Sequence, residues 1–343
     1  MTELPWLPGA SLYASGSHAL VELVRWGARQ AGWRRVWLPS YYCPDVPAAL
    51  AAAVVGEVEL RAYPDAALWS SADLGSIPAA TGDVVVVANQ LGVRGQPDVS
   101  GAIARGAAVV EDHSHDLASS WALESGADYA FASLRKTLPI PDGGAVWSPQ
   151  GRPLPPPAAR RDGREPASPT LSAADRLATA LDARRRRAAP SDERLRFRAL
   201  ARAAARSAGA LGWGGISPVS RALLRQMPVR GWRERRRQNL AVLADAVASA
   251  PRLRALAAPS GGVAFALTLV FDTAGARHAA ERALTSRAVV PTVLWPLDLV
   301  RDWGVWPADA DLASRILSIH GDQRYDEADV RRLARILGQT LRG

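Results

Sequence analysis

One lysine stands out among the residues that could carry chemistry, because the 343-residue chain contains no other. Lysine and arginine together number 42, and every one of them except Lys136 is arginine. Arginine stays protonated and is a poor nucleophile, whereas a partly buried lysine can lose its proton and add to a carbonyl carbon. We therefore expect Lys136 to form a Schiff base. The alternative is a surface lysine that was retained by chance.

A carboxylate precedes this lysine at the end of an apolar run. Residues 107–112 (AAVVED) have the pattern of a buried strand that ends at Asp112, and open α/β sheets bind ligands at the carboxyl ends of their strands. Pyridoxal phosphate needs a lysine for its aldehyde, a carboxylate beside its pyridine nitrogen and donors for its phosphate. Lys136 and Asp112 would supply the first two, so the sequence predicts this cofactor and makes these residues its catalytic pair.

Several short stretches, taken in order, resemble the fold type I pyridoxal-phosphate enzymes and, among them, the DegT/DnrJ/StrS sugar aminotransferases. The stretches are SGSHAL (15–20), VWLPSYYCPDV (36–46), NQLGVRG (89–95), VVEDHSHD (109–116), ASLRKTLPIPDGG (132–144), VLWPL (293–297) and SIHGDQRY (318–325). The resemblance implies an α/β fold, in which a three-layer αβα large domain with a mostly parallel sheet precedes a smaller C-terminal α+β domain. We expect the large domain over residues 1–229 and the small domain over 230–343. The resemblance also implies a homodimer.

The start of the expected helix over residues 17–31 is a candidate phosphate site. Backbone N–H groups at a helix N-terminus attract anions, and Gly16, Ser17 and His18 stand at this point. By itself the pattern favours a plain serine N-cap, whereas the resemblance implies the phosphate role.

The resemblance also implies roles for residues spread over the other stretches. The further cofactor contacts would be Tyr42, Gln90, Ser114, His115, Ser133 and Arg135, and the substrate contacts would be Tyr41, Asn89, Trp295, His320 and Arg324. Other roles fit some of these residues equally well. Tyr42 would stack on the pyridine ring or be an ordinary core tyrosine, and Asn89 and Gln90 would touch the ligand or close a loop. The lysine segment is shorter than the family's commonest form, which leaves the role of Arg135 open.

The spacing of apolar residues predicts alternating strands and helices. Strands are expected over 34–42 and 56–63, a strand followed by a loop over 83–92 and a short helix over 99–107, and the strand that ends at Asp112 follows it. This alternation with continuous apolar strands is typical of a mostly parallel sheet that is covered on both faces.

The second half of the chain matches the family less completely. Residues 150–229 form a divergent arginine- and alanine-rich segment, predicted to be helical after a proline-rich connection, and they match no motif of the family. The small domain is expected to contain a helix over 230–250, a strand over 265–273 and a closing helix over 328–342. The divergent segment leaves the substrate class open.

Composition limits the function classes. The chain is 48% hydrophobic without an apolar run of membrane-spanning length, and its first ten residues lack the features of a signal peptide. The single cysteine, Cys43, and five histidines without zinc spacing predict neither an intrachain disulfide nor a metal site. The net charge of +9 raises the question of a nucleic-acid partner. The arginines alternate with alanine and no recognition motif accompanies them, so we expect a cytoplasmic enzyme that binds neither nucleic acid nor membranes.

The sequence thus predicts an aminotransferase that moves an amino group from an amino acid donor to a keto or aldehyde acceptor. A nucleotide sugar is the acceptor that the resemblance implies, and a smaller molecule is the alternative. The same apparatus also serves elimination, replacement and decarboxylation. A homologue that binds the cofactor without catalysis is a further alternative, against which the presence of both Lys136 and Asp112 argues.

Overall fold

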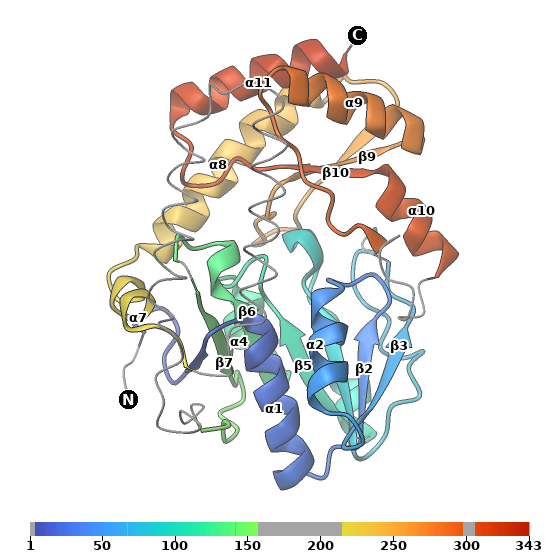
Figure 1. The fold of residues 1–343 in the computed structure, drawn as a ribbon, viewed down its shortest axis with the longest axis vertical. Helices are drawn as coiled ribbons and strands as arrows, with labels where there is room; N and C mark the ends of the chain where they lie inside the picture. The colour runs from blue at the N-terminus through green and yellow to red at the C-terminus, as the bar shows by residue number, and fades with distance from the viewer. Residues whose placement is uncertain (1–3, 67, 141, 157–214, 298–305, 343) are drawn as a thin grey trace.

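A seven-stranded sheet fills the larger lobe of the computed structural model, which describes residues 4–66, 68–140, 142–156, 215–297 and 306–342 (Figure 1). Its strands are β1 (Ser11–Tyr13), β2 (Arg35–Pro39), β3 (Glu59–Tyr63), β4 (Asp83–Ala88), β5 (Ala108–Asp112), β6 (Tyr129–Ser133) and β7 (Gly144–Trp147). They lie in the order β1-β7-β6-β5-β4-β2-β3. The five strands from β6 to β3 are parallel, and β7 is antiparallel to both β6 and β1. The predicted mostly parallel sheet is confirmed.

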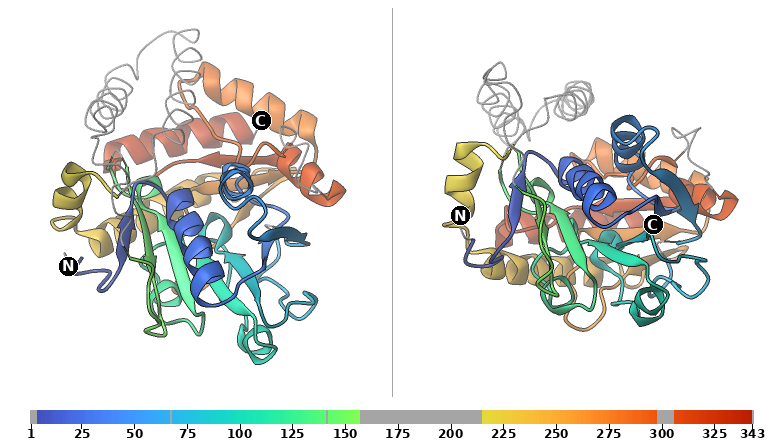
Figure 2. Two further views of the ribbon diagram at one scale, coloured as in Figure 1. Left: turned by 60° about the horizontal axis from the view of Figure 1, so that its bottom comes forward. Right: turned by 90° about the horizontal axis from the view of Figure 1, so that it is seen from below.

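Helices cover both faces of this sheet (Figure 2). On one face lie α1 (Gly16–Gln30) and α2 (Asp45–Ala53), and on the other lie the short helices α3 (Ser100–Ala104) and α4 (Ser120–Glu124). Strand β4 shows the reason for its unbroken apolar sequence: Val84 and Val86 pack towards α1 and α2, whereas Val85 and Val87 pack towards α3. A strand that is buried on both faces needs apolar residues at every position.

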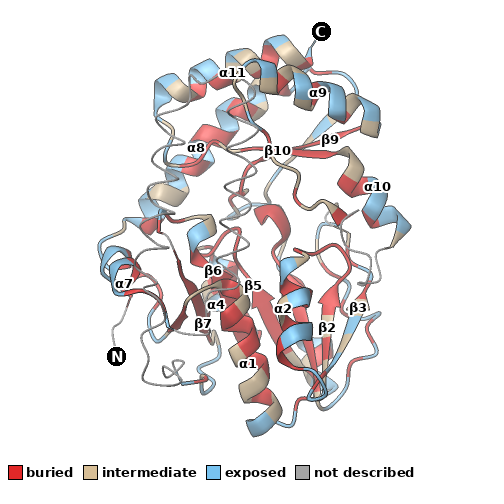
Figure 3. Cartoon of the chain, viewed as in Figure 1, coloured by how far each residue is buried: buried red, intermediate tan, exposed pale blue. Residues whose placement is uncertain are grey.

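The smaller lobe is built on a three-stranded antiparallel sheet. Its strands are β8 (Leu253–Leu256), β9 (Leu267–Phe271) and β10 (Ile316–Ile319), in the order β10-β9-β8. The helices α8 (Val229–Val247), α9 (Ala274–Ser286) and α11 (Glu327–Leu341) pack on this sheet and share one apolar core with it. Figure 3 shows their buried faces turned towards the strands and their exposed faces turned outwards.

Four shorter elements complete the described structure: the helices α7 (Pro218–Leu224) and α10 (Pro307–Arg315) and the 3₁₀ turns η1 (Gln90–Gly92) and η2 (Leu134–Lys136). An apolar cluster that includes Tyr41 and Leu91 of the larger lobe and Phe265 of the smaller one joins the two lobes. None of the described helices combines the length and the hydrophobicity that a membrane crossing needs.

The structure differs from the sequence-based expectations at several ends. The strand expected over 34–42 ends at Pro39, and residues 40–42 bend away from the sheet. The strands β1, β8 and β10 were not anticipated. Most of the helical segment predicted within 150–229 falls on residues 157–214, which lie outside the described residues, and α7 belongs to its described remainder.

Candidate active site

The carboxyl ends of the parallel strands lie beneath the smaller lobe (Figure 1), and several of the predicted site residues follow those ends in the chain. Strand β4 pairs with β5 so that Ala88 stands opposite Asp112, which brings the residues after both strands to one edge of the sheet. A hollow with an empty volume of about 210 Å³ opens there. It is lined by Tyr42, Ala88, Asn89, Gln90, Asp112, His115 and Trp295. Six of these seven residues were predicted from the sequence to be site residues.

Two hydrogen bonds fix the carboxylate of Asp112 in this hollow. Its Oδ2 accepts a hydrogen bond of 2.7 Å from the hydroxyl of Tyr42, and its Oδ1 accepts one of 2.8 Å from the backbone N–H of Ser114. Burial and the charge of Asp112 raise the pKa of Tyr42 well above its ordinary value, so this hydroxyl remains a donor. A carboxylate oxygen accepts more than one hydrogen bond, and Asp112 therefore retains acceptor capacity for a protonated ring nitrogen.

His115 presents an unused donor to the same hollow. Its Nδ1 accepts a 2.9 Å hydrogen bond from the N–H of Leu91, and burial, followed by the charge of Lys136, lowers its pKa well below the ordinary value. The imidazole is therefore neutral and carries its proton on Nε2, which has no hydrogen-bond partner among the described residues. Oδ1 of Asn89 is likewise buried without a partner in the described part of the chain. Buried polar atoms without partners in a hollow indicate a ligand site.

Lys136 stands beside this hollow, at the end of the turn η2 that follows β6. Its Nζ lies 4.8 Å from the centroid of the Trp295 ring, and that ring stacks on His115 at a centroid distance of 5.7 Å. The hydroxyl of Tyr41 accepts a 3.1 Å hydrogen bond from the N–H of Trp295 and donates one to the carbonyl of Leu294. Tyr41 is fully buried, so its described contacts position Trp295 rather than reach a substrate.

The N-terminus of α1 forms a close-fitting cradle beside β6. Ser15 caps the helix, since its Oγ accepts a 3.2 Å hydrogen bond from the N–H of His18. A Cβ added to Gly16 would lie 2.7 Å from the Cβ of Ser133, and one added to Gly144 would lie 2.1 Å from the carbonyl oxygen of Ser15. Only glycine fits at either position. The N-cap role thus falls to Ser15, and the first N–H groups of α1, which have no intrahelical acceptor, lie next to Ser133 as a phosphate site requires.

The other predicted residues lie around this centre. Gln90 donates from its side chain to the carbonyl of Tyr41, and Oγ of Ser114 accepts a 2.9 Å hydrogen bond from the N–H of Ser133. The ring of His320 packs edge-on against Phe265.

Two predicted arginines are placed less favourably for ligand binding. The side chain of Arg135 is exposed. Arg324 pairs with Asp322 through both carboxylate oxygens, with its Nε 2.8 Å from Oδ1. The structure therefore does not bring either guanidinium into the hollow.

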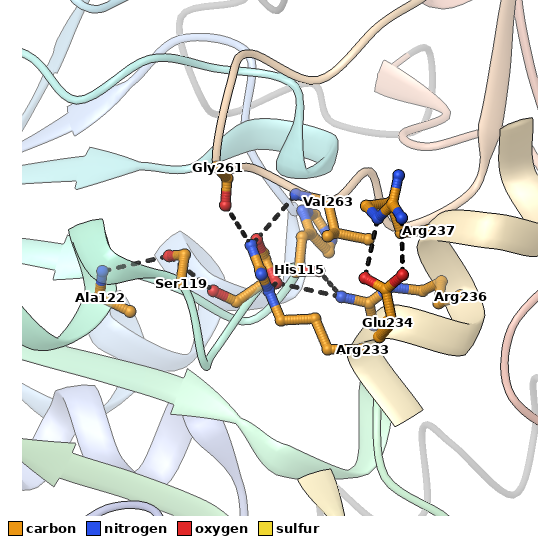
Figure 4. Close-up of polar contacts among 10 residues, drawn as sticks. His115, Ser119, Ala122, Arg233, Glu234, Arg236, Arg237, Gly261 and Val263 are labelled. Carbon is orange, nitrogen blue, oxygen red and sulfur yellow. Dashed lines mark hydrogen bonds and ion pairs between the residues drawn. The ribbon is translucent and has the colours of Figure 1, made fainter. Parts of the chain in front are cut away.

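A charged cluster beside the backbone of His115 was not predicted from the sequence. Asp116 receives Arg233 and Arg236 from α8, which converge on the loop that follows His115 (Figure 4). The spacing of three residues places both arginines on one face of the helix. That spacing was the only available signal, and the many other arginines of the chain obscured it.

No protein-family model and no curated protein sequence matches the chain, whereas solved structures do. A DegT DnrJ EryC1 StrS aminotransferase from Brucella abortus has a TM-score of 0.63 at 14% identity, over 98% of this chain and 86% of that one. DesI, solved in the presence of its TDP-sugar product, has a TM-score of 0.62 at 20% identity, over 98% and 81%. Helicobacter pylori PseC, an aminotransferase of pseudoaminic acid biosynthesis, has a TM-score of 0.65 at 11% identity, over 98% and 87%. The chain therefore has the fold of these solved structures, which is the fold that the resemblance implied.

Proposed function

We propose that this chain is a pyridoxal-phosphate-dependent aminotransferase of the DegT/DnrJ/StrS type. The observation that carries the proposal is the placement of Lys136 and Asp112. The only lysine of the chain and a hydrogen-bonded carboxylate flank one hollow at the carboxyl ends of parallel strands. The shared fold with sugar aminotransferases supports it.

The residues around the hollow suit this cofactor. The first N–H groups of α1, at Gly16 and Ser17, together with Ser133 would hold its phosphate, and Asp112 would hold its ring nitrogen. The unpaired Nε2 of His115 and Oδ1 of Asn89 offer a donor and an acceptor to its remaining polar groups or to the substrate. The tight cradle of Gly16 and Gly144 and these unpaired atoms are the observations on which the fit rests.

When bound, the cofactor supplies an electron sink for the charge that remains on the α-carbon after a proton is removed. Asp112 would keep a proton on the ring nitrogen, because its carboxylate is held by Tyr42 and Ser114 with acceptor capacity left over. The free amine of Lys136 would carry the proton between the α-carbon and C4′ of the cofactor. The ring of Trp295, which lies 4.8 Å from Nζ of Lys136 and stacks on His115, would position that amine.

We infer an amino acid as the amino donor and a keto sugar carried on a nucleotide as the acceptor. Support for a sugar comes from the neighbours, since DesI was solved with a TDP-sugar and PseC acts in pseudoaminic acid biosynthesis. The net charge of +9 suits an anionic substrate, because a basic protein raises the local concentration of anions. A smaller keto or aldehyde acceptor is the alternative.

Half-reactions test the reaction type. The holoenzyme is mixed with single amino acids without an acceptor. The expected product is one equivalent of the matching keto acid per site. Addition of a keto sugar should then allow further turnovers. Release of ammonia or carbon dioxide would instead indicate elimination or decarboxylation. Absence of any reaction with all donors would favour a non-catalytic binding protein.

We also propose that the enzyme is a cytoplasmic homodimer, with a large domain over residues 1–229 and a small domain over 230–343. The two separate sheets support this division. Sedimentation of the holoenzyme is expected to give the mass of a dimer, and a fully loaded monomer would contradict that part of the proposal.

A further inference from the structure

A second hollow is lined in part by residues that directly follow candidate active-site residues in the chain. Its empty volume is about 240 Å³, and Asp116 and Thr137, which follow His115 and Lys136 in the chain, contribute to its wall together with Arg236 of α8. Nothing in the proposed reaction uses these residues.

Asp116 has no capacity left for a further donor. Its Oδ1 accepts from Nε of Arg233 at 2.7 Å and from Nη2 of Arg236 at 3.2 Å. Its Oδ2 accepts from Nη2 of Arg233 at 2.7 Å and from the N–H of Val263 at 3.0 Å (Figure 4). The single negative charge of Asp116 stands against the positive charges of Arg233 and Arg236, so these three side chains together carry one positive charge in excess.

Two buried donors of this wall have no acceptor. The side chain of Arg236 is 5% exposed, and its Nε has no hydrogen-bond partner among the described residues. The same holds for the buried Oγ1 of Thr137 within the described part of the chain. A buried N–H of a charged guanidinium without an acceptor is unfavourable, so an oxygen-bearing ligand is expected to supply one.

The rest of the wall indicates the polarity of that ligand. Leu117, Leu138, Val229 and Trp232 supply apolar surface. A ligand with an apolar body and one anionic head suits this wall. A carboxylate is a head that can accept from both donors beside one excess positive charge.

We propose that this second hollow binds a small carboxylic acid, whose carboxylate accepts hydrogen bonds from Nε of Arg236 and Oγ1 of Thr137. The inference rests on the charge and the hydrogen bonding of the described residues and does not depend on the proposed function. A free acid and the carboxylate of an amino donor share this chemistry.

Calorimetric titration of the full chain with benzoate tests the proposal, with benzamide as the neutral control. Saturable binding of benzoate is expected, and none of benzamide. Thr137→Val is expected to weaken benzoate binding about fivefold, and Arg236→Met about tenfold or more, as the loss of a neutral and of a charged donor implies. The matched control is Arg237→Met, since Arg237 lies on the exposed side of α8 and pairs there with Glu234.

Three results would overturn the proposal: no saturable binding of benzoate, equal binding of benzamide, or wild-type affinity in both Thr137→Val and Arg236→Met. If Arg236→Met does not fold, Thr137→Val alone decides, because it changes the side-chain volume little. Competition between benzoate and a saturating amino donor would assign the bound carboxylate to the donor, and independent binding would assign it to a separate acid.

Discussion

The amine of Lys136 lies over the ring of Trp295, with 4.8 Å between Nζ and the ring centroid. The backbone of Trp295 is held in turn by the hydroxyl of Tyr41, which comes from the opposite lobe and bonds to both 294 and 295. The environment of the only lysine therefore depends on the buried Tyr41, whose backbone carbonyl also accepts a hydrogen bond from the side chain of Gln90.

Tyr41→Phe should disturb the cofactor site more than the fold. The variant loses both bonds to the segment that carries Trp295, and we expect a destabilisation of about 1–3 kcal/mol together with weaker retention of the cofactor. Tyr63→Phe is the matched control, because Tyr63 is also buried and, among the described residues, its hydroxyl bonds only to the carbonyl of Val86. Urea unfolding and cofactor titration measure the two effects. Equal cofactor affinity in both variants would contradict the role assigned to Tyr41.

Asp112→Asn should retain much of the fold and some cofactor while losing most of the rate. An amide cannot stabilise a protonated ring nitrogen as a carboxylate does, and removal of one such electrostatic partner typically costs about 10²- to 10³-fold. Steady-state kinetics with the amino donor identified by the half-reactions measures the loss. Activity within a few-fold of the wild type would remove Asp112 from the catalytic pair.

Acid should destabilise the protein through its buried histidines. Burial lowers the pKa of His115 and of His320 below the ordinary 6.5, so the unfolded chain takes up protons on acidification before the folded chain does. The free energy of unfolding should therefore be unaffected by these groups above about pH 6.5 and fall below it, by up to about 1.4 kcal/mol per pH unit for each histidine.

His115→Gln isolates one of these contributions, because glutamine can still accept from the N–H of Leu91 but does not titrate. Its stability should fall less steeply than that of the wild type as the pH drops from 6.5 towards the lowered pKa of His115. Denaturant unfolding over this range is the measurement. Parallel pH profiles for the two proteins would show that His115 is not held neutral in the folded state.

The sequence predicted the centre of the site because two local signals coincided there. Apolar runs defined the ends of β4 and β5, and polar residues such as Asn89 and Asp112 follow those ends at the sheet edge. The fold class followed from the same alternation of strands and helices together with the ordered motifs.

The parts that could not be predicted depend on long-range packing. The resemblance implied a substrate contact for Tyr41, whereas in the structure the chain bends after Pro39 and the Tyr41 hydroxyl bonds to the segment at 294 and 295. Arg236 could not be distinguished from the other arginines, since only the approach of α8 to Asp116 buries it. The strand β1, which pairs with β7, has only three residues, and this length is too short to show a periodic pattern.

The single lysine allows the most direct test of the account. The holoenzyme is reduced with borohydride, digested and mapped by mass spectrometry, and Lys136→Arg is assayed beside the wild type. We predict one pyridoxyl group per chain, fixed at Lys136, and a Lys136→Arg variant that keeps the positive charge but has neither the visible absorption band nor activity. An adduct found only at the N-terminal amine, or an active Lys136→Arg enzyme, would contradict the central claim.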